Sequence, residues 1–213
     1  MAGRRAVIVG AVAWIVQPLY LVAELVAARG STAPYSLLDQ TISDLGATQC
    51  TTIAYPYGDV AVCSPWHPLV NASFVVFGVL LALGAVLLRG SLPRPRLATA
   101  STVAWVVAGL SSVATGLVPV DQDLELHALV ALPSLVALPL ALLLLAASLH
   151  PAVPRLGAAT AVVGLASLAG SVAFLLTATS PDLGGLWERL AFWPSYLWVP
   201  VVAVALLRRR GPA

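Results

Sequence analysis

The chain has 213 residues, of which 60% are hydrophobic and only 9% are charged, and its mean hydropathy is +0.94. Soluble domains usually carry about 25% charged residues, so this composition excludes an ordinary soluble protein and indicates a membrane protein. The formal net charge is only +2, and no basic cluster with interleaved aromatic residues occurs, which excludes a nucleic-acid-binding protein.

Six apolar segments are long enough to cross a bilayer, which takes about 20 residues. The predicted spans cover residues 6–28, 67–88, 97–118, 127–149, 156–178 and 190–207, and residues 29–66 form the long connection. The sequence therefore predicts a single transmembrane domain over residues 1–213. Its fold class is an all-α integral membrane bundle of six transmembrane helices with one long outer loop between the first two. A cleaved signal peptide is the alternative for the first span, but its apolar stretch of about 23 residues exceeds a signal-peptide core.

The uneven distribution of arginines sets the predicted orientation, because cytoplasmic loops carry an excess of basic residues. All eleven basic residues are arginines, and with the N-terminus inside only Arg29 and Arg189 lie outside. The nine on the cytoplasmic side are Arg4, Arg5, Arg89, Arg94, Arg96, Arg155, Arg208, Arg209 and Arg210. The acidic residues gather toward the opposite side. Both termini are therefore predicted to be cytoplasmic.

The long outer loop contains both cysteines of the chain, Cys50 and Cys63. On the oxidising side of the membrane a disulfide is the expected state, and closing this loop would constrain the unfolded chain by about 3 kcal/mol. A metal-binding cysteine pair is the alternative, but a lone pair without two nearby histidines is weak zinc spacing. We therefore expect a tied loop that caps the bundle.

The first span carries an unusual polar face, since Gln17, Tyr20 and Glu24 are spaced three and four residues apart. Polar residues are costly inside a membrane, so they face partners, water or a function. Glu24 is the carboxylate at bilayer depth. It is predicted either to function there or to pair with Arg29 or Arg189.

Two histidines arrive at the same outer membrane level. His67 opens the second span four residues before Asn71, and His127 opens the fourth span shortly after Asp121 and Asp123. Imidazole and carboxylate groups together suit a metal or a general base, although a histidine at a helix start more often caps the helix. The metal candidates are His67, Asp121 and His127; the sequence leaves the cofactor open, with zinc as the metal that such ligands could bind. An aromatic belt at the outer interface is predicted from Trp66, Trp187, Trp193, Tyr196 and Trp198.

Four motifs resemble a known family. They are Thr41-Ile-Ser43-Asp-Leu45-Gly46 after Tyr35-Ser36, Asn71-Ala-Ser-Phe74-Val-Val-Phe-Gly78, Gly116-Leu-Val-Pro119-Val-Asp121 with His127, and Gly185-Leu-Trp-Glu-Arg189. Over essentially the whole chain this pattern resembles a prokaryotic six-span membrane family known as domain of unknown function 998. The resemblance implies the same fold and topology, and it carries no activity. We expect a multi-pass protein of the cell membrane, in a bacterial plasma membrane.

Two functions fit these residues. The first is an acidic extracytoplasmic vestibule that binds a lipid head group, a small molecule or a partner protein, with the binding candidates Tyr20, Glu24, Ser43, Asp44, His67, Asn71, Asp121, Asp123, His127 and Arg189. The alternative is a metal-dependent membrane-embedded hydrolase acting on lipid at the outer leaflet, with the catalytic candidates Glu24, Asp44 and His127. A transporter is disfavoured, because no polar track continues toward the cytoplasmic half and no inverted repeat is visible.

Overall fold

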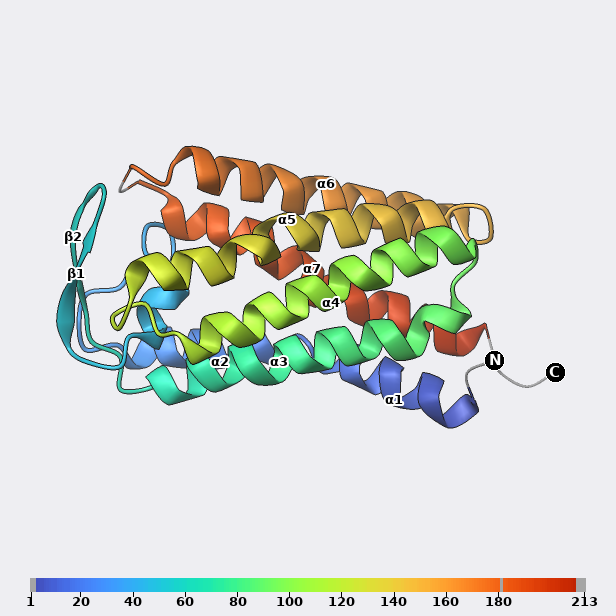
Figure 1. The fold of residues 1–213 in the computed structure, drawn as a ribbon, viewed down its shortest axis with the longest axis horizontal. Helices are drawn as coiled ribbons and strands as arrows, with labels where there is room; N and C mark the ends of the chain where they lie inside the picture. Colours follow the sequence, from blue (N-terminus) through green and yellow to red (C-terminus); the bar gives the residue numbers. More distant parts are fainter. Residues whose placement is uncertain (1–2, 181, 210–213) are drawn as a thin grey trace.

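The computed structural model describes residues 3–180 and 182–209, which form an elongated helical bundle with a small β-hairpin at one end (Figure 1). Within these residues six helical segments are long and apolar enough to cross a membrane, so the prediction of six spans is confirmed. Their bounds are Arg4–Gly30, His67–Ser91, Pro95–Leu117, Leu124–Leu149, Pro154–Leu176 and Gly184–Arg208. Arg210, predicted to be cytoplasmic, lies outside the described residues.

The helices form a closed arrangement in which the last span returns to the first. Each of α3 (His67–Leu88), α4 (Pro95–Leu117), α5 (Leu124–Leu149), α6 (Pro154–Leu176) and α7 (Gly184–Arg208) packs against its neighbour in the chain, and α1 (Arg4–Ile15) packs against α3 and α7. A short 3-10 helix, η2 (Arg89–Ser91), extends α3. Leu110, Val162 and Leu176 are among the large apolar side chains exposed on the bundle surface, which suits contact with lipid chains.

The first span is broken into two helices, α1 and α2 (Leu19–Gly30), although its apolar pattern predicts one continuous span. Pro18 has no backbone N–H and cannot continue the hydrogen-bond ladder. The backbone N–H of Gln17 donates to Trp14 O instead of Ala13 O, the acceptor that a continuous α-helix would use. The side-chain amide of Gln17 donates to Ala13 O at 3.1 Å in its place. The same amide donates to Phe77 O of α3 at 3.3 Å, so the break is fastened to a neighbouring helix.

Small residues bring α3 and α4 into backbone contact. A Cβ built on Gly78 would lie 2.6 Å from the carbonyl oxygen of Gly109, so neither position tolerates a side chain without movement of a helix. Nearby, the Ser112 hydroxyl donates to Phe74 O at 2.8 Å and adds an interhelical hydrogen bond. Close packing and hydroxyl bonds therefore hold this pair, where no hydrophobic driving force operates in lipid.

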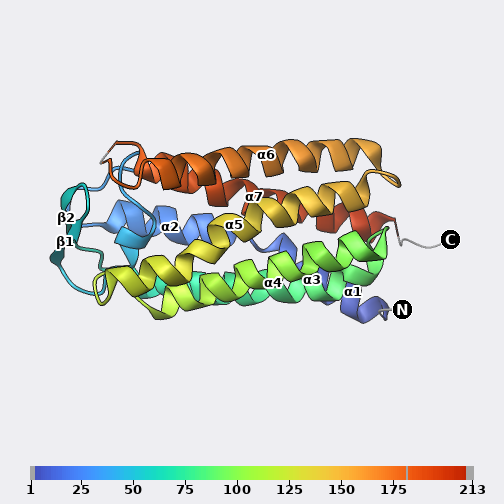
Figure 2. The ribbon, with the colours of Figure 1, turned by 45° about the horizontal axis from the view of Figure 1, so that its top comes forward.

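Residues 31–66, which we call the cap, cover one end of the bundle. The cap contains a 3-10 helix, η1 (Ser43–Gly46), and an antiparallel hairpin of β1 (Thr51–Tyr55) and β2 (Gly58–Val62). The disulfide between Cys50 and Cys63 closes the base of the hairpin and confirms the predicted bond. Figure 2 shows the cap at one end of the bundle, with the first residues of α1 and the last residues of α7 at the opposite end. The predicted all-α class omits this hairpin.

The last helix begins at Gly184, six residues before the predicted start at residue 190. The prediction starts the span just after Glu188 and Arg189, because charged side chains are costly in lipid. In the folded chain both side chains are buried, at 7% and 5% exposure, and both have partners in the cap or in α2. The helix can therefore carry these charges inside the protein.

Candidate functional site at the capped end

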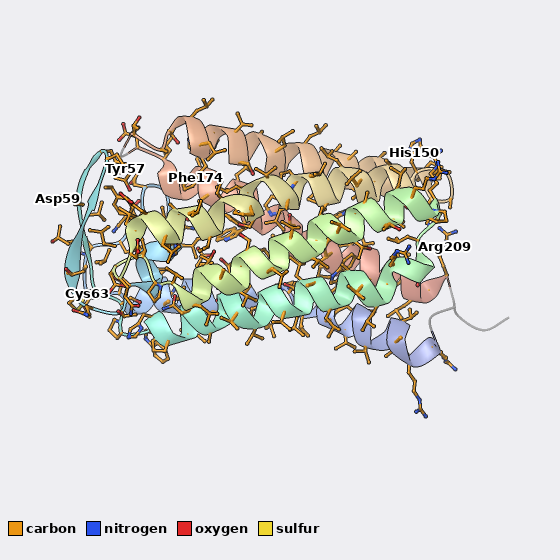
Figure 3. All side chains as sticks on the ribbon, viewed as in Figure 1. Tyr57, Asp59, Cys63, His150, Phe174 and Arg209 are labelled. Carbon is orange, nitrogen blue, oxygen red and sulfur yellow. A yellow bond between two sulfur atoms is a disulfide. The ribbon has the colours of Figure 1, made fainter. Side chains whose placement is uncertain are left out.

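Most of the sequence-predicted site residues lie where the cap meets α2, α5 and α7. Figure 3 marks Tyr57, Asp59 and Cys63 at this capped end and His150 and Arg209 at the opposite end. Three groups of contacts connect the cap to the helices: the Arg189 cluster, the carboxylates around η1, and the Ser43–His127 pair.

Arg189 and Glu24 form a buried ion pair between α7 and α2. The Arg189 Nε donates to Glu24 Oε1 at 2.8 Å, and the indole of Trp193 donates to Glu24 Oε2 at 2.8 Å. Glu24 is 1% exposed, so both of its oxygens are satisfied by protein donors rather than by water. Of the two partners left open by the sequence, the structure selects Arg189.

The rest of the Arg189 guanidinium holds the cap. Its Nη1 donates to the carbonyl oxygens of Leu37 at 2.7 Å and Gln40 at 2.9 Å, and its Nη2 donates to the Tyr35 hydroxyl at 2.6 Å. The Tyr35 hydroxyl in turn donates to Thr41 O at 2.8 Å, and burial raises the pKa of Tyr35, which keeps the phenol neutral. One arginine therefore fixes the path of the segment that leads into η1.

Two buried carboxylates fix η1 itself. Glu188 accepts from the backbone N–H of Ile42 at 2.5 Å. Asp44, only 2% exposed, accepts from the backbone N–H of Thr41 at 2.8 Å and from the Tyr55 hydroxyl at 2.6 Å. Burial raises the pKa of Asp44, and the hydrogen bonds from Tyr55 and Thr41 oppose that rise. The catalytic candidates Glu24 and Asp44 are thus occupied by structural bonds.

His127 joins the start of α5 to η1. Its Nδ1 lies 2.6 Å from Val118 O, and its Nε2 lies 2.8 Å from the Ser43 hydroxyl oxygen. A carbonyl oxygen can only accept, so Nδ1 carries the hydrogen and the neutral ring accepts the Ser43 proton at Nε2. Ser43 and His127 are 8% and 6% exposed. The pair has the geometry of a nucleophile and its base.

Two more candidates attach the cap to α3 and to the connection between α4 and α5, and a third candidate stabilises the start of α5. Asn71 donates from Nδ2 to Gly46 O at 2.8 Å. Asp121 accepts from the N–H and the hydroxyl of Thr48, at 2.9 and 2.8 Å, and from Gln49 N at 3.0 Å. Asp123 caps the N-terminus of α5 by accepting from Leu126 N at 2.9 Å. These side chains therefore make structural contacts.

Two candidates lie apart from these contacts, and the metal candidates do not converge. Tyr20 is buried in the bundle, where its ring stacks on Tyr196 with centroids 4.5 Å apart. His67 is the first residue of α3 and half-buried. Across residues 3–180 and 182–209 no three or more His, Cys, Asp and Glu side chains are placed to hold a metal ion. Both ring nitrogens of His127 and both carboxylate oxygens of Asp121 already have protein partners.

The cap contains a cavity of about 310 Å³. Its lining consists of Asp39, Asp59, Tyr57 and Gln40 with Pro34, Val60 and Ala61, so none of the described lining residues is basic. We call this feature the cap cavity. All seven residues belong to the cap, and none belongs to a spanning helix.

Sequence reasoning misses several residues that build this end of the molecule. The sequence assigns Trp193 to the aromatic belt, yet its indole is bonded to Glu24. Tyr35 and Tyr55 are expected only as loop residues, yet their hydroxyls bind Arg189 and Asp44. Tyr35 and Arg189 are 154 positions apart, so no local pattern in the sequence specifies their contact.

The fold and the apolar spans define this chain as a multi-pass membrane protein. Residues 8–205 match the family described as protein of unknown function (DUF998), and the chain belongs to this family. The resemblance seen in the sequence motifs is therefore confirmed. No curated protein and no solved structure matches the chain.

Proposed function

We propose that this protein binds a small organic cation in the cap cavity, on the extracytoplasmic side of a cell membrane, in a bacterial plasma membrane. The observation that carries the proposal is the lining of the cavity, in which two carboxylates and a phenol occur without a basic side chain among the described residues. Such a lining attracts positive charge and repels anions.

The charge distribution supports the orientation. Eight described arginines lie at the end of the bundle opposite the cap: Arg4, Arg5, Arg89, Arg94, Arg96, Arg155, Arg208 and Arg209. All nine acidic residues belong to the cap or to parts of helices and connections next to it. Loops rich in arginine lie on the cytoplasmic side of a membrane. The proposal therefore places the arginine-rich end of the bundle and both termini inside, and the cap outside.

The side chains of the cavity suit an ammonium group. Hydrogen bonds from the Ser36 hydroxyl and the Leu183 amide lower the pKa of Asp39, which keeps its carboxylate ionised at neutral pH. Burial, with the nearby carboxylate of Asp44, raises the pKa of Tyr57 to about 12, so the phenol stays neutral. Carboxylates beside an aromatic ring are a recurring means of binding organic cations.

A soluble cation fits this cavity better than a lipid head group. The lining residues come from the cap, whose hairpin lies beyond the ends of the spanning helices (Figure 1). A head group anchored in the bilayer would have to leave the interface to reach Tyr57 and Asp59. A free amine or quaternary ammonium compound reaches them from solution.

The test is titration calorimetry of the protein in uncharged detergent with choline, ethanolamine and spermidine. Asp59→Asn is the informative variant, because Asp59 is exposed and its substitution leaves the hairpin pairing of Ala54 with residue 59 in place. One carboxylate about 4 Å from an ammonium contributes about 1 kcal/mol even in water, so the variant should bind at least about fivefold more weakly.

Glu125→Gln is the matched control, since Glu125 is an exposed carboxylate in the first turn of α5 and not part of the cavity. Its affinity should equal that of the wild type. Binding that needs added phosphatidylethanolamine and is absent with free ethanolamine would transfer the site to a lipid head group. An absence of cation binding, or equal losses in both variants, would refute the proposal.

A further inference from the structure

We propose that Ser43 and His127 form a nucleophilic site that cleaves an acyl ester of a membrane lipid. This inference is independent of the cation site in the cap cavity. The base is the imidazole of His127 and the nucleophile is the hydroxyl of Ser43. The hydroxyl proton is directed at the lone pair on His127 Nε2.

The ring is held in the tautomer that a general base requires. Val118 O, at the end of α4, accepts from Nδ1 at 2.6 Å, which leaves Nε2 with its lone pair toward Ser43. In serine-histidine-aspartate triads a carboxylate performs this task. A backbone carbonyl fixes the same tautomer and orientation without adding a negative charge, so we expect a weaker base than in a full triad.

The nucleophile is also positioned rigidly. Ser43 is the first residue of η1, and buried carboxylates hold the backbone N–H groups of the two residues before it. Glu188 binds the N–H of Ile42, and Asp44 binds the N–H of Thr41 and the Tyr55 hydroxyl. A hydroxyl whose neighbours are anchored in this way stays in place for attack, which is the positioning that catalysis requires.

The reaction balances with water as the only co-reactant. Ser43 Oγ bonds to the ester carbonyl carbon while its proton passes to His127 Nε2. The carbon–oxygen bond to the alcohol then breaks, and the leaving oxygen takes the proton from Nε2. Water attacks the acyl-serine, its proton passes to Nε2 and then to Ser43 Oγ, and the carboxylic acid is released.

The position of the pair indicates the substrate class. His127 lies in the first turn of α5, at the boundary between the cap and the spanning segment. On the same helix Leu126 is 42% exposed and Leu129 is 66% exposed, so this part of α5 has an apolar surface for an acyl chain. An ester at the end of a lipid chain is the bond that would meet Ser43 at this level.

The test is covalent labelling of the protein in lipid nanodiscs with a long-chain alkyl fluorophosphonate, followed by peptide mass spectrometry. We expect label on Ser43, and a rate that falls about 10²–10⁴-fold in His127→Gln, which removes the base but keeps a polar side chain of similar reach. Ser112→Ala is the matched control, since Ser112 is buried and donates to a backbone carbonyl instead of a histidine. Its labelling rate should stay within about twofold of the wild type.

Two outcomes would overturn the inference. One is folded wild-type protein, with its normal melting temperature, that carries no label at Ser43. The other is label at Ser43 whose rate is unchanged in His127→Gln. An ethyl fluorophosphonate that reacts as fast as the long-chain reagent would overturn the assignment to lipid. Asp59→Asn, which weakens the proposed cation site, should leave the labelling rate unchanged, so the two proposals fail separately.

Discussion

Replacing Arg189 by methionine removes the charge that neutralises Glu24 and all the hydrogen bonds from α7 side chains to the carbonyls of Leu37 and Gln40. Methionine has a similar reach and no charge, so the change leaves a buried carboxylate beside an apolar side chain. Breaking a buried ion pair in this way costs about 3–5 kcal/mol. For a chain of this size about 1 kcal/mol corresponds to about 2–4 °C, so the melting temperature should fall by about 6–20 °C.

The assay is thermal unfolding in detergent followed by tryptophan fluorescence and far-ultraviolet circular dichroism. The indole of Trp193, one of six tryptophans, is bonded to Glu24, so its share of the fluorescence reports on this cluster. Arg29→Met is the matched control, because Arg29 is exposed at the end of α2. Its melting temperature should stay within about 2 °C of the wild type.

A double variant, Glu24→Gln with Arg189→Met, separates charge from lost hydrogen bonds. Removing both charges should restore part of the stability that Arg189→Met loses. The losses of the two single variants should exceed that of the double variant by a coupling free energy of about 1–3 kcal/mol. The reasoning is refuted if Arg189→Met is no more destabilising than Arg29→Met. It is also refuted if the two single losses in the cycle simply add.

Four further predictions concern the cap and the helix packing. Replacing both disulfide cysteines by serine should free the base of the hairpin at a cost of about 3 kcal/mol, seen as faster amide exchange of residues 51–62 with the spanning helices unchanged. Gly109→Val should cost at least about 1–3 kcal/mol and lower the melting temperature, whereas Gly3→Val, with nothing within 4 Å, should not. Burial raises the pKa of Asp44, so the contribution of this group to the free energy of unfolding is fully present below pH 3.8 and is lost as the pH rises through its folded pKa. Asp44→Asn should therefore cost less stability at about pH 7 than at about pH 4. The pKa of Asp39 is lowered, so its effect on stability depends on pH in the opposite way. Its contribution is present above pH 3.8 and is lost as the pH falls through its folded pKa. Asp39→Asn should therefore lower the melting temperature more at about pH 6 than at about pH 3.

The apolar pattern is sufficient to find the spans, because about 20 consecutive apolar residues rarely occur outside a transmembrane helix. It fails where a charge or a proline lies inside a span. The break at Pro18 could have been predicted from the proline alone. The early start of α7 could not, because Glu188 and Arg189 are acceptable in the helix only through partners far away in the sequence.

The cap is the least predictable part. The hairpin has a readable signal, since the β-branched residues from Thr51 to Ile53, together with Val60 and Val62, flank the Tyr-Pro-Tyr-Gly segment at residues 55–58. That signal is easily overlooked in an otherwise helical chain. The pairing of Ser43 with His127 joins residues separated by 84 positions, and no local pattern specifies such a contact. The sequence predicts that His127 lies at the outer level of the membrane, but it does not predict that Ser43 is its partner.

The anchoring of the cap by α7 has a consequence for the order of synthesis. The bonds from Arg189, Glu188 and the first amides of α7 reach back to residues 37–42, and Glu188 is separated from Ile42 by 146 positions. A ribosome adding about 5–20 residues per second needs about 7–30 s to cover that interval. During this time the carboxylate of Glu24 already sits in the membrane without its arginine. The first loop to leave the ribosome is therefore completed by the last helix, and a nascent chain stalled after α6 would expose an unfinished cap and an unpaired acid to quality control.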